Sequence, residues 1–152
     1  MNAPLLKRIE ADLKDALKRS DRLKVSVLRM IKASIKNKEI EKGSPLSDEE
    51  IISVLTSLSK QRRESIEEFR RAGREELVEK ETAELSVLQS YMPEQLSEEE
   101  LNDIINSAIQ ESGATSVRDI GKVMKIVMPR VKGRADGKVV NQKVRAILES
   151  SD

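Results

Sequence analysis

Apolar residues recur at every third or fourth position along almost the whole chain. This period places them on one face of an α-helix, whereas a half-buried strand alternates apolar and polar residues. Short runs that look strand-like, such as VSVL at residues 25–28, lie inside longer helical periodicity. The pattern therefore predicts helices throughout, beginning near Pro4, Asp21, Ser47, Gly73, Ser97, Ser116 and Asp136.

Capping residues and turn residues separate these helices. Ser47 with Glu50, and Ser97 with Glu100, have the spacing of a capping box. In that motif the serine hydroxyl accepts from an N–H of the first turn, and the glutamate accepts from the N–H of the serine. Glycines are expected to end three of the helices, at positions 43, 73 and 113.

A break near Pro93 divides the expected helices into two groups. The residues before it suffice for four helices in an antiparallel arrangement. The residues after it form a unit of roughly 55 residues, small but large enough to fold. We therefore expect an all-α fold with an N-terminal four-helix antiparallel domain, residues 1–95, and a small C-terminal three-helix domain, residues 96–152.

The amino-acid composition limits which catalytic groups and metal ligands the protein has. The 152 residues include no cysteine and no histidine, so thiol chemistry and the commonest general base and zinc ligand are missing. Phe69 and Tyr91 are the two aromatic residues, so the core must be aliphatic. The N-terminus is amphipathic with early acids, unlike a secretory signal, and no apolar run approaches membrane length. We expect a cytoplasmic protein, not inserted in a membrane, with no cofactor and no metal.

Charge is balanced over the whole chain but not locally. The net charge is +1, yet residues 98–111 hold five acids and no base. Residues 117–148 hold nine bases against two acids, Asp119 and Asp136, a net +7. Such a concentration of positive charge suits phosphates. The nine bases are Arg118, Lys122, Lys125, Arg130, Lys132, Arg134, Lys138, Lys143 and Arg145.

The stretch RVKGRADGKVVNQKV, residues 130–144, has two interpretations. In the first, Gly133 and Gly137 let a ligand approach the backbone, and the N-terminus of the last helix attracts an anion. In the second, Gly133 only ends one helix, Asp136 caps the next, and the lysines are solvated. No aromatic residue lies here to stack on bases, so nucleic acid would be held by its backbone and shape.

Other candidates favour structural roles. Arg62 and Glu81 fall on the apolar sides of their helices, which predicts a partly buried ion pair. Tyr91 is expected to pack at the joint near Pro93, with its hydroxyl bonded to water or backbone. Bases and acids interleave over residues 60–76, which is typical of helix-surface pairing, although a second RNA contact there stays open. The acids at residues 48–50 and 98–100 are helix starts, and neither Gly-Lys pair has the spacing of a nucleotide-binding loop.

Two long segments carry a family resemblance. Residues 121–148, GKVMKIVMPRVKGRADGKVVNQKVRAIL, resemble the tail of the B subunit of the glutamine-dependent aminoacyl-tRNA amidotransferase. Residues 60–101 resemble the stand-alone relatives of that tail, the GatB/YqeY family. The resemblance implies an all-helical fold and a tail-like domain that helps to hold tRNA. Family labels often read carbon–nitrogen ligase with glutamine as amido donor, which we regard as inherited from the larger subunit.

By the resemblance, one turn of this chain matches the tail's glycine-containing turn and helix entry. The tail commonly has Asn-Pro where this chain has Asp136-Gly137. The residues that carry the match are Lys132, Gly133, Arg134, Ala135, Asp136 and Asn141.

We therefore expect a non-catalytic accessory protein that binds tRNA or another structured RNA. The alternatives are an adaptor for an acidic protein surface, and a subunit that assists an amidotransferase or other protein partner. No catalytic residue is assigned. The candidate RNA-binding residues are Lys122, Lys125, Arg130, Lys132, Gly133, Arg134, Gly137, Lys138 and Asn141.

Overall fold

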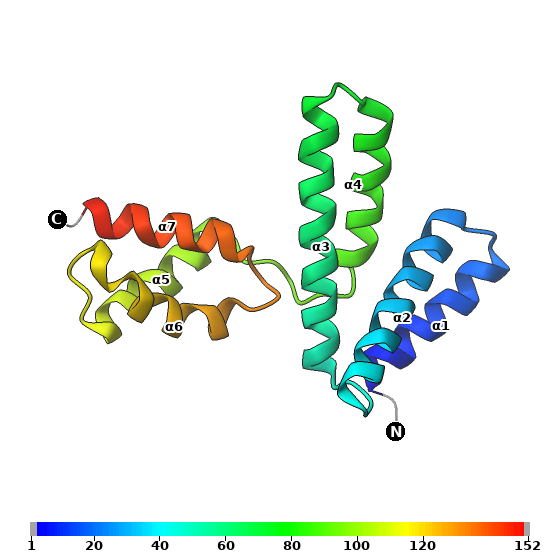
Figure 1. Cartoon of the computed structure of the whole chain (residues 1–152), viewed down its shortest axis with the longest axis horizontal. Coiled ribbons are helices and arrows are strands. Elements are labelled where there is room, and N and C mark those ends of the chain that lie inside the picture. Colours follow the sequence, from blue (N-terminus) through cyan, green and yellow to red (C-terminus); the bar gives the residue numbers. More distant parts are fainter. Residues whose placement is uncertain (1–2, 151–152) are drawn as a thin grey trace. The chain divides into compact units, whose positions relative to one another are not determined.

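The computed structural model describes residues 3–150 as seven α-helices and one short 3₁₀-helix, with no strand among these residues (Figure 1). The all-α class is confirmed. Contacts divide the chain into two compact units, Met1–Pro93 and Glu94–Asp152.

The first unit contains four helices. Asp21 caps the second through a bond from the Lys24 N–H to Oδ1, 3.1 Å, and both halves of the predicted capping box form at Ser47. Gly43 ends the second helix in the left-handed conformation, with a φ of 80°. The helices are α1 (Pro4–Lys18), α2 (Arg22–Lys42), α3 (Asp48–Arg71) and α4 (Glu75–Gln89).

An aliphatic core holds this unit together. Adjacent helices pair as α1 with α2 and α3 with α4, and α2 also contacts α3 and α4 (Figure 1). The helix α2 contacts every other helix of the unit. It buries four residues on the face that makes these contacts, and its opposite face is exposed to solvent. The large core side chains include Ile9, Leu28, Ile31, Ile35, Ile51, Leu55 and Leu88.

Tyr91 belongs to this same core, and only 4% of its surface is exposed. Its hydroxyl donates to Oδ2 of Asp12 at 2.6 Å, and the guanidinium of Arg8 lies 4.7 Å from the ring centre. The sequence-based expectation of a water or backbone partner is therefore wrong, because α1 brings a carboxylate within reach. Burial, followed by the bond to Asp12, raises the pKa of Tyr91.

The predicted ion pair between Arg62 and Glu81 forms, with Nη1 and Oε2 2.7 Å apart. A second carboxylate, Glu84, lies 2.8 Å from Nη2, and Sδ of Met30 accepts from the same nitrogen at 3.0 Å. All three charged side chains are mostly buried: 23% of Arg62, 14% of Glu81 and 8% of Glu84 is exposed. One guanidinium thus ties α2 and α4 to α3.

The second unit contains three α-helices around a core of branched and small aliphatic residues. Ser116 caps the 3₁₀-helix through the Arg118 N–H, and α6 begins at Ile120. The elements are α5 (Glu98–Ser112), η1 (Val117–Asp119), α6 (Ile120–Val131) and α7 (Gly137–Ser150). The core is Leu101, Ile105, Ala108, Val123, Val127, Val131, Val140, Val144 and Leu148.

Replacing Arg62 with alanine is expected to lower the free energy of unfolding by about 3 kcal/mol, because two mostly buried carboxylates lose their counter-charge. Urea unfolding measures this. Arg70→Ala is the matched control, since Arg70 pairs with Glu67 on the exposed side of α3. It should cost less than about 0.5 kcal/mol. Equal effects of the two changes would contradict the structural importance of the triad.

A free tyrosine has a pKa of about 10. In the folded protein Tyr91 should stay protonated at a pH well above that value. The chain has one tyrosine and no tryptophan, so phenolate absorbance reports this single group. Because the folded pKa is raised, the resulting stabilisation is present below the unfolded pKa and is lost as pH rises through the folded pKa. Asp12→Asn should move the absorbance transition to lower pH. An unchanged transition would show that Asp12 does not hold the hydroxyl.

Candidate nucleic-acid interface

The turn between α6 and α7 begins as a type II β-turn. Lys132 has φ −53° and ψ 124°, Gly133 has φ 76°, and the Arg134 N–H donates to the Val131 carbonyl at 2.8 Å. The third residue of a type II turn needs a positive φ, which glycine adopts without a steric penalty. Gly133 is thus explained by the geometry of the turn.

The segment that enters the unit clamps this turn. The Leu96 N–H donates to the Arg134 carbonyl at 2.9 Å, and Nε2 of Gln95 donates to the Gly133 carbonyl at 3.0 Å. Nε of Arg134 reaches the Glu94 carbonyl at 3.3 Å. Gly133 is buried and Arg134 is half-buried. These two predicted RNA ligands therefore already make hydrogen bonds within the second unit.

Asp136 occupies the start of α7, as expected for a cap. Its Oδ1 accepts from the Lys138 N–H at 3.0 Å, and its carbonyl accepts from the Val140 N–H at 3.0 Å. The chain's own carboxylate therefore lies where a bound anion was expected. At Gly137 an added Cβ would meet Cε of Met128 at 3.3 Å, so a larger residue there requires the end of this partly exposed side chain to shift.

Several of the predicted bases already have acidic partners. Arg130 makes two bonds to Glu111, at 2.6 and 2.9 Å, and these bonds raise the pKa of Arg130 and lower that of Glu111. Lys143 donates to Glu98 at 2.9 Å, and Nζ of Lys122 lies 3.9 Å from Asp119. These positive charges are partly compensated before any ligand arrives.

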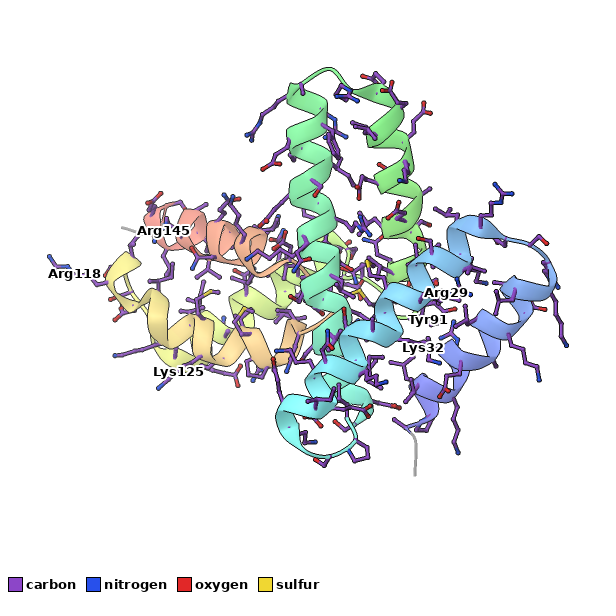
Figure 2. All side chains as sticks on the ribbon, turned by 45° about the vertical axis from the view of Figure 1, so that its right-hand side comes forward. Arg29, Lys32, Tyr91, Arg118, Lys125 and Arg145 are labelled. Atoms are coloured by element: carbon purple, nitrogen blue, oxygen red, sulfur yellow. The ribbon has the colours of Figure 1, made fainter. Side chains whose placement is uncertain are left out.

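Five exposed bases of the second unit have no acidic partner within residues 3–150. We call them the free C-terminal bases. Figure 2 labels three of them, one each from η1, α6 and α7, and Arg118 extends away from the ribbon. Two of the five were absent from the predicted site, although the charge count along the sequence contained them. The five are Arg118, Lys125, Lys132, Lys138 and Arg145.

Asn141, the last predicted ligand, is half-buried in α7. It lies one turn after Lys138, so it shares that side of the helix. The carboxamide can both donate and accept hydrogen bonds. The structure thus places Lys138 and Asn141 close together, whereas Gly133 and Arg134 belong to the clamped turn.

A groove of about 530 Å³ lies in the first unit, between the end of α2 and the first half of α3. Both of its acids are paired with lysines: Glu41 with Lys38 at 3.4 Å, and Glu50 with Lys42 at 2.6 Å, where Glu50 also caps α3. The lysine bond, followed by the bond from the Ser47 N–H, lowers the pKa of Glu50 to about 2. General acid–base groups work best with a pKa near the working pH. Glu50 therefore serves the helix start and is poorly suited to proton transfer.

No helix in the described part of the chain combines the length and the apolar character needed to cross a membrane. Within residues 3–150, no three acidic side chains gather where they could hold a metal ion.

The fold and the charge distribution define a class: an all-helical protein whose second unit exposes unpaired bases. Comparison with known families is more specific. The model of the family described as Yqey-like protein matches residues 6–148. The chain belongs to this YqeY family, and the resemblance predicted from the sequence is confirmed.

Curated relatives share one name, "Altered inheritance of mitochondria protein 41, mitochondrial". The protein of Pyrenophora tritici-repentis is 37% identical over 149 residues, which cover 95% of this chain and 81% of the relative. That of Eremothecium gossypii is 40% identical over 88 residues, 57% of this chain and 48% of the relative. That of Saccharomyces cerevisiae (strain YJM789) is 35% identical over 85 residues, 55% of this chain. The matches thus span about half the length of the latter two relatives.

The expectation of a cytoplasmic protein is overturned by these relatives, which are named as mitochondrial. That expectation rested on missing secretory and membrane-spanning patterns. Such absences do not identify a compartment.

Gly133→Ala should lower the stability of the protein by about 1 to 2 kcal/mol, because an alanine at φ 76° is strained. Urea unfolding followed by circular dichroism measures the change. Gly121→Ala is the control: this glycine is exposed in α6, and its added Cβ meets nothing within 4 Å. The control should be neutral or stabilising, by up to about 1 kcal/mol. If Gly133→Ala unfolds at the same urea concentration as the wild type, the positive φ at this position does not require glycine.

Proposed function

We propose that the protein is a non-catalytic accessory that binds tRNA or another structured RNA through its second unit. In this proposal the two units act as separate domains, an N-terminal four-helix domain and a C-terminal three-helix domain that resembles the amidotransferase tail. The observation that carries the proposal is the set of free C-terminal bases, which have no acidic partner within residues 3–150. Phosphates are the ligands that such unpaired bases attract most strongly.

The placement of these bases supports a ligand-binding role. Acids near a helix N-terminus and bases near its C-terminus are favourable, and the reverse is unfavourable. The helices α3, α4 and α5 start with acids, whereas α6 and α7 have no acid in the first turn and carry Lys122 and Lys138 there. Asp119 and Asp136 precede these two helices, and Lys122 lies 3.9 Å from Asp119. Lys138 is therefore the unpaired base of the two within residues 3–150, and a phosphate would neutralise its charge.

The contacts are expected to be non-specific with respect to base sequence. The described part of the second unit holds no aromatic side chain, so base stacking is not available there. Lysine and arginine contacts to phosphate position an RNA without reading its bases. Recognition would then depend on the spacing of phosphates in a folded RNA, which distinguishes tRNA from an unstructured strand.

A second candidate function is a protein adaptor, favoured by two exposed apolar residues beside the same bases. Met128 is 36% exposed on α6 and Val139 is 41% exposed on α7. The neighbouring lysines would then face an acidic protein surface. An amidotransferase or another protein could be such a partner. Met128→Ser/Val139→Ser should weaken a protein complex and leave RNA binding unchanged.

The test is the affinity for bulk tRNA, measured by fluorescence anisotropy across a salt series. The logarithm of affinity should fall linearly with the logarithm of salt concentration, by about 0.7 to 0.9 per contacted phosphate. Lys125→Gln/Lys132→Gln/Lys138→Gln should make this slope shallower by about 2 to 3. Arg134 is left intact because it holds the turn.

The control Lys60→Gln/Arg71→Gln/Lys80→Gln removes the same total charge from exposed positions of α3 and α4. It should retain the wild-type slope, whereas a shallower slope would assign an RNA contact to residues 60–76, the second contact that the sequence leaves open. If the wild-type protein does not bind tRNA at low salt, the proposal is wrong. If both triple variants lose the same affinity, the binding follows net charge and no particular surface.

A further inference from the structure

We infer that the outer face of α2, in the first unit, is a second phosphate-binding surface for RNA. The inference deepens the proposed function and rests on it. The surface is defined by Arg22, Ser26, Arg29, Ala33 and Lys36, and we call it the α2 strip.

The sequence of α2 places these five residues on one face. The three bases are seven residues apart, which is close to two helical turns, so they align along the helix. Ser26 and Ala33 follow a base by four residues and fall on the same side. All five are exposed, whereas the core residues Val27, Leu28, Ile31 and Ile35 occupy the opposite side. Figure 2 labels Arg29 and Lys32 along this helix.

The charge along α2 is one-sided. Residues 22–36 hold five bases and no acid. Lys32 lies 3.7 Å from Glu10, but the three bases of the strip have no acidic partner within residues 3–150. The first acids of the helix are Glu39 and Glu41, near its C-terminal end.

The start of α2 combines one acid at the N-cap with two bases in the first turn. Its first turn holds no acid and carries Arg22 and Lys24. The N-cap, Asp21, uses its carboxylate on the Lys24 N–H at 3.1 Å. Bases at the positive end of a helix are unfavourable for its stability. Asp21 offsets one of the two charges, so the first turn of α2 together with its N-cap keeps a net positive charge.

The side chains between the bases favour RNA over a membrane. A helix that lies on a bilayer needs large apolar residues beside its cations. The α2 strip has Ser26 and Ala33 in those places, which are small and allow close approach of a phosphate backbone. The exposed large apolar residues of α2, Leu23 and Ile40, lie near the ends of the helix. The strip is about 21 Å long, a length that spans several consecutive phosphates of an A-form RNA strand.

The experiment measures bulk tRNA binding across a salt series for four full-length proteins. They are the wild type, Arg22→Gln/Arg29→Gln/Lys36→Gln, the C-terminal triple variant defined above, and the six-site combination. The α3/α4 triple variant serves as the charge-matched control, and urea unfolding verifies that each variant is folded. Vesicles of phosphatidylcholine with phosphatidylserine replace the tRNA in a parallel series.

The α2 variant is expected to bind tRNA with a salt slope shallower by about 2 to 3, and the six-site variant should lose the sum of both effects. If the C-terminal variant loses slope while the α2 variant matches the control, the inference is wrong and the proposed function stands. If the α2 variant alone loses slope, the inference stands and the C-terminal assignment is wrong. If the wild type binds no tRNA, both are wrong. Binding to the vesicles that depends on the strip, without binding to tRNA, would assign it to a membrane instead.

Discussion

Burial of the aliphatic faces of the helices is the interaction that holds each unit together and determines where its charged residues lie. The chain has one phenylalanine, one tyrosine and no cysteine, so neither aromatic packing nor a disulfide can substitute for helix-on-helix burial. Each unit must therefore turn its leucine, isoleucine and valine residues inward, and nearly all the charged residues lie on the surface. The Arg62–Glu81–Glu84 cluster is the main exception, and there one guanidinium of α3 satisfies two carboxylates of α4.

Once the charges are on the surface, their pairing decides what each surface can bind. Some bases form ion pairs with acids of the same chain, which partly neutralises their charge: Arg130, Lys143 and Lys42. The free C-terminal bases and the α2 strip have no such partners within residues 3–150. The α2 strip, Lys125, Lys138 and Arg145 lie on helices with no acid in the first turn, although an aspartate precedes each of these helices. The same chain starts α3, α4 and α5 with acids in the first turn. The contrast within one chain is what makes a ligand-binding explanation stronger than a solvated surface.

Local patterns were enough to predict the helices, the two capping boxes, the Asp136 cap and the Arg62–Glu81 pair, because each depends on residues within a few turns or on one facing helix. Contacts between distant segments were not readable from the sequence. The clamp of residues 94–96 on the turn at Gly133, and the bond between Tyr91 and Asp12, join positions that only the folded chain brings together. The α2 strip differs, because the heptad spacing of Arg22, Arg29 and Lys36 is visible in the sequence, whereas a sum of charges along the chain does not resolve one face of a helix.

The central claim is that unpaired bases on particular helix faces bind RNA, and lysine footprinting tests it most directly. The protein is modified with an amine-reactive reagent, with and without bulk tRNA, and each lysine is quantified by mass spectrometry. The account predicts protection of Lys36, Lys125, Lys132 and Lys138 by tRNA, with Lys60 and Lys80 unchanged. Equal protection of all exposed lysines, or protection of none, would contradict it.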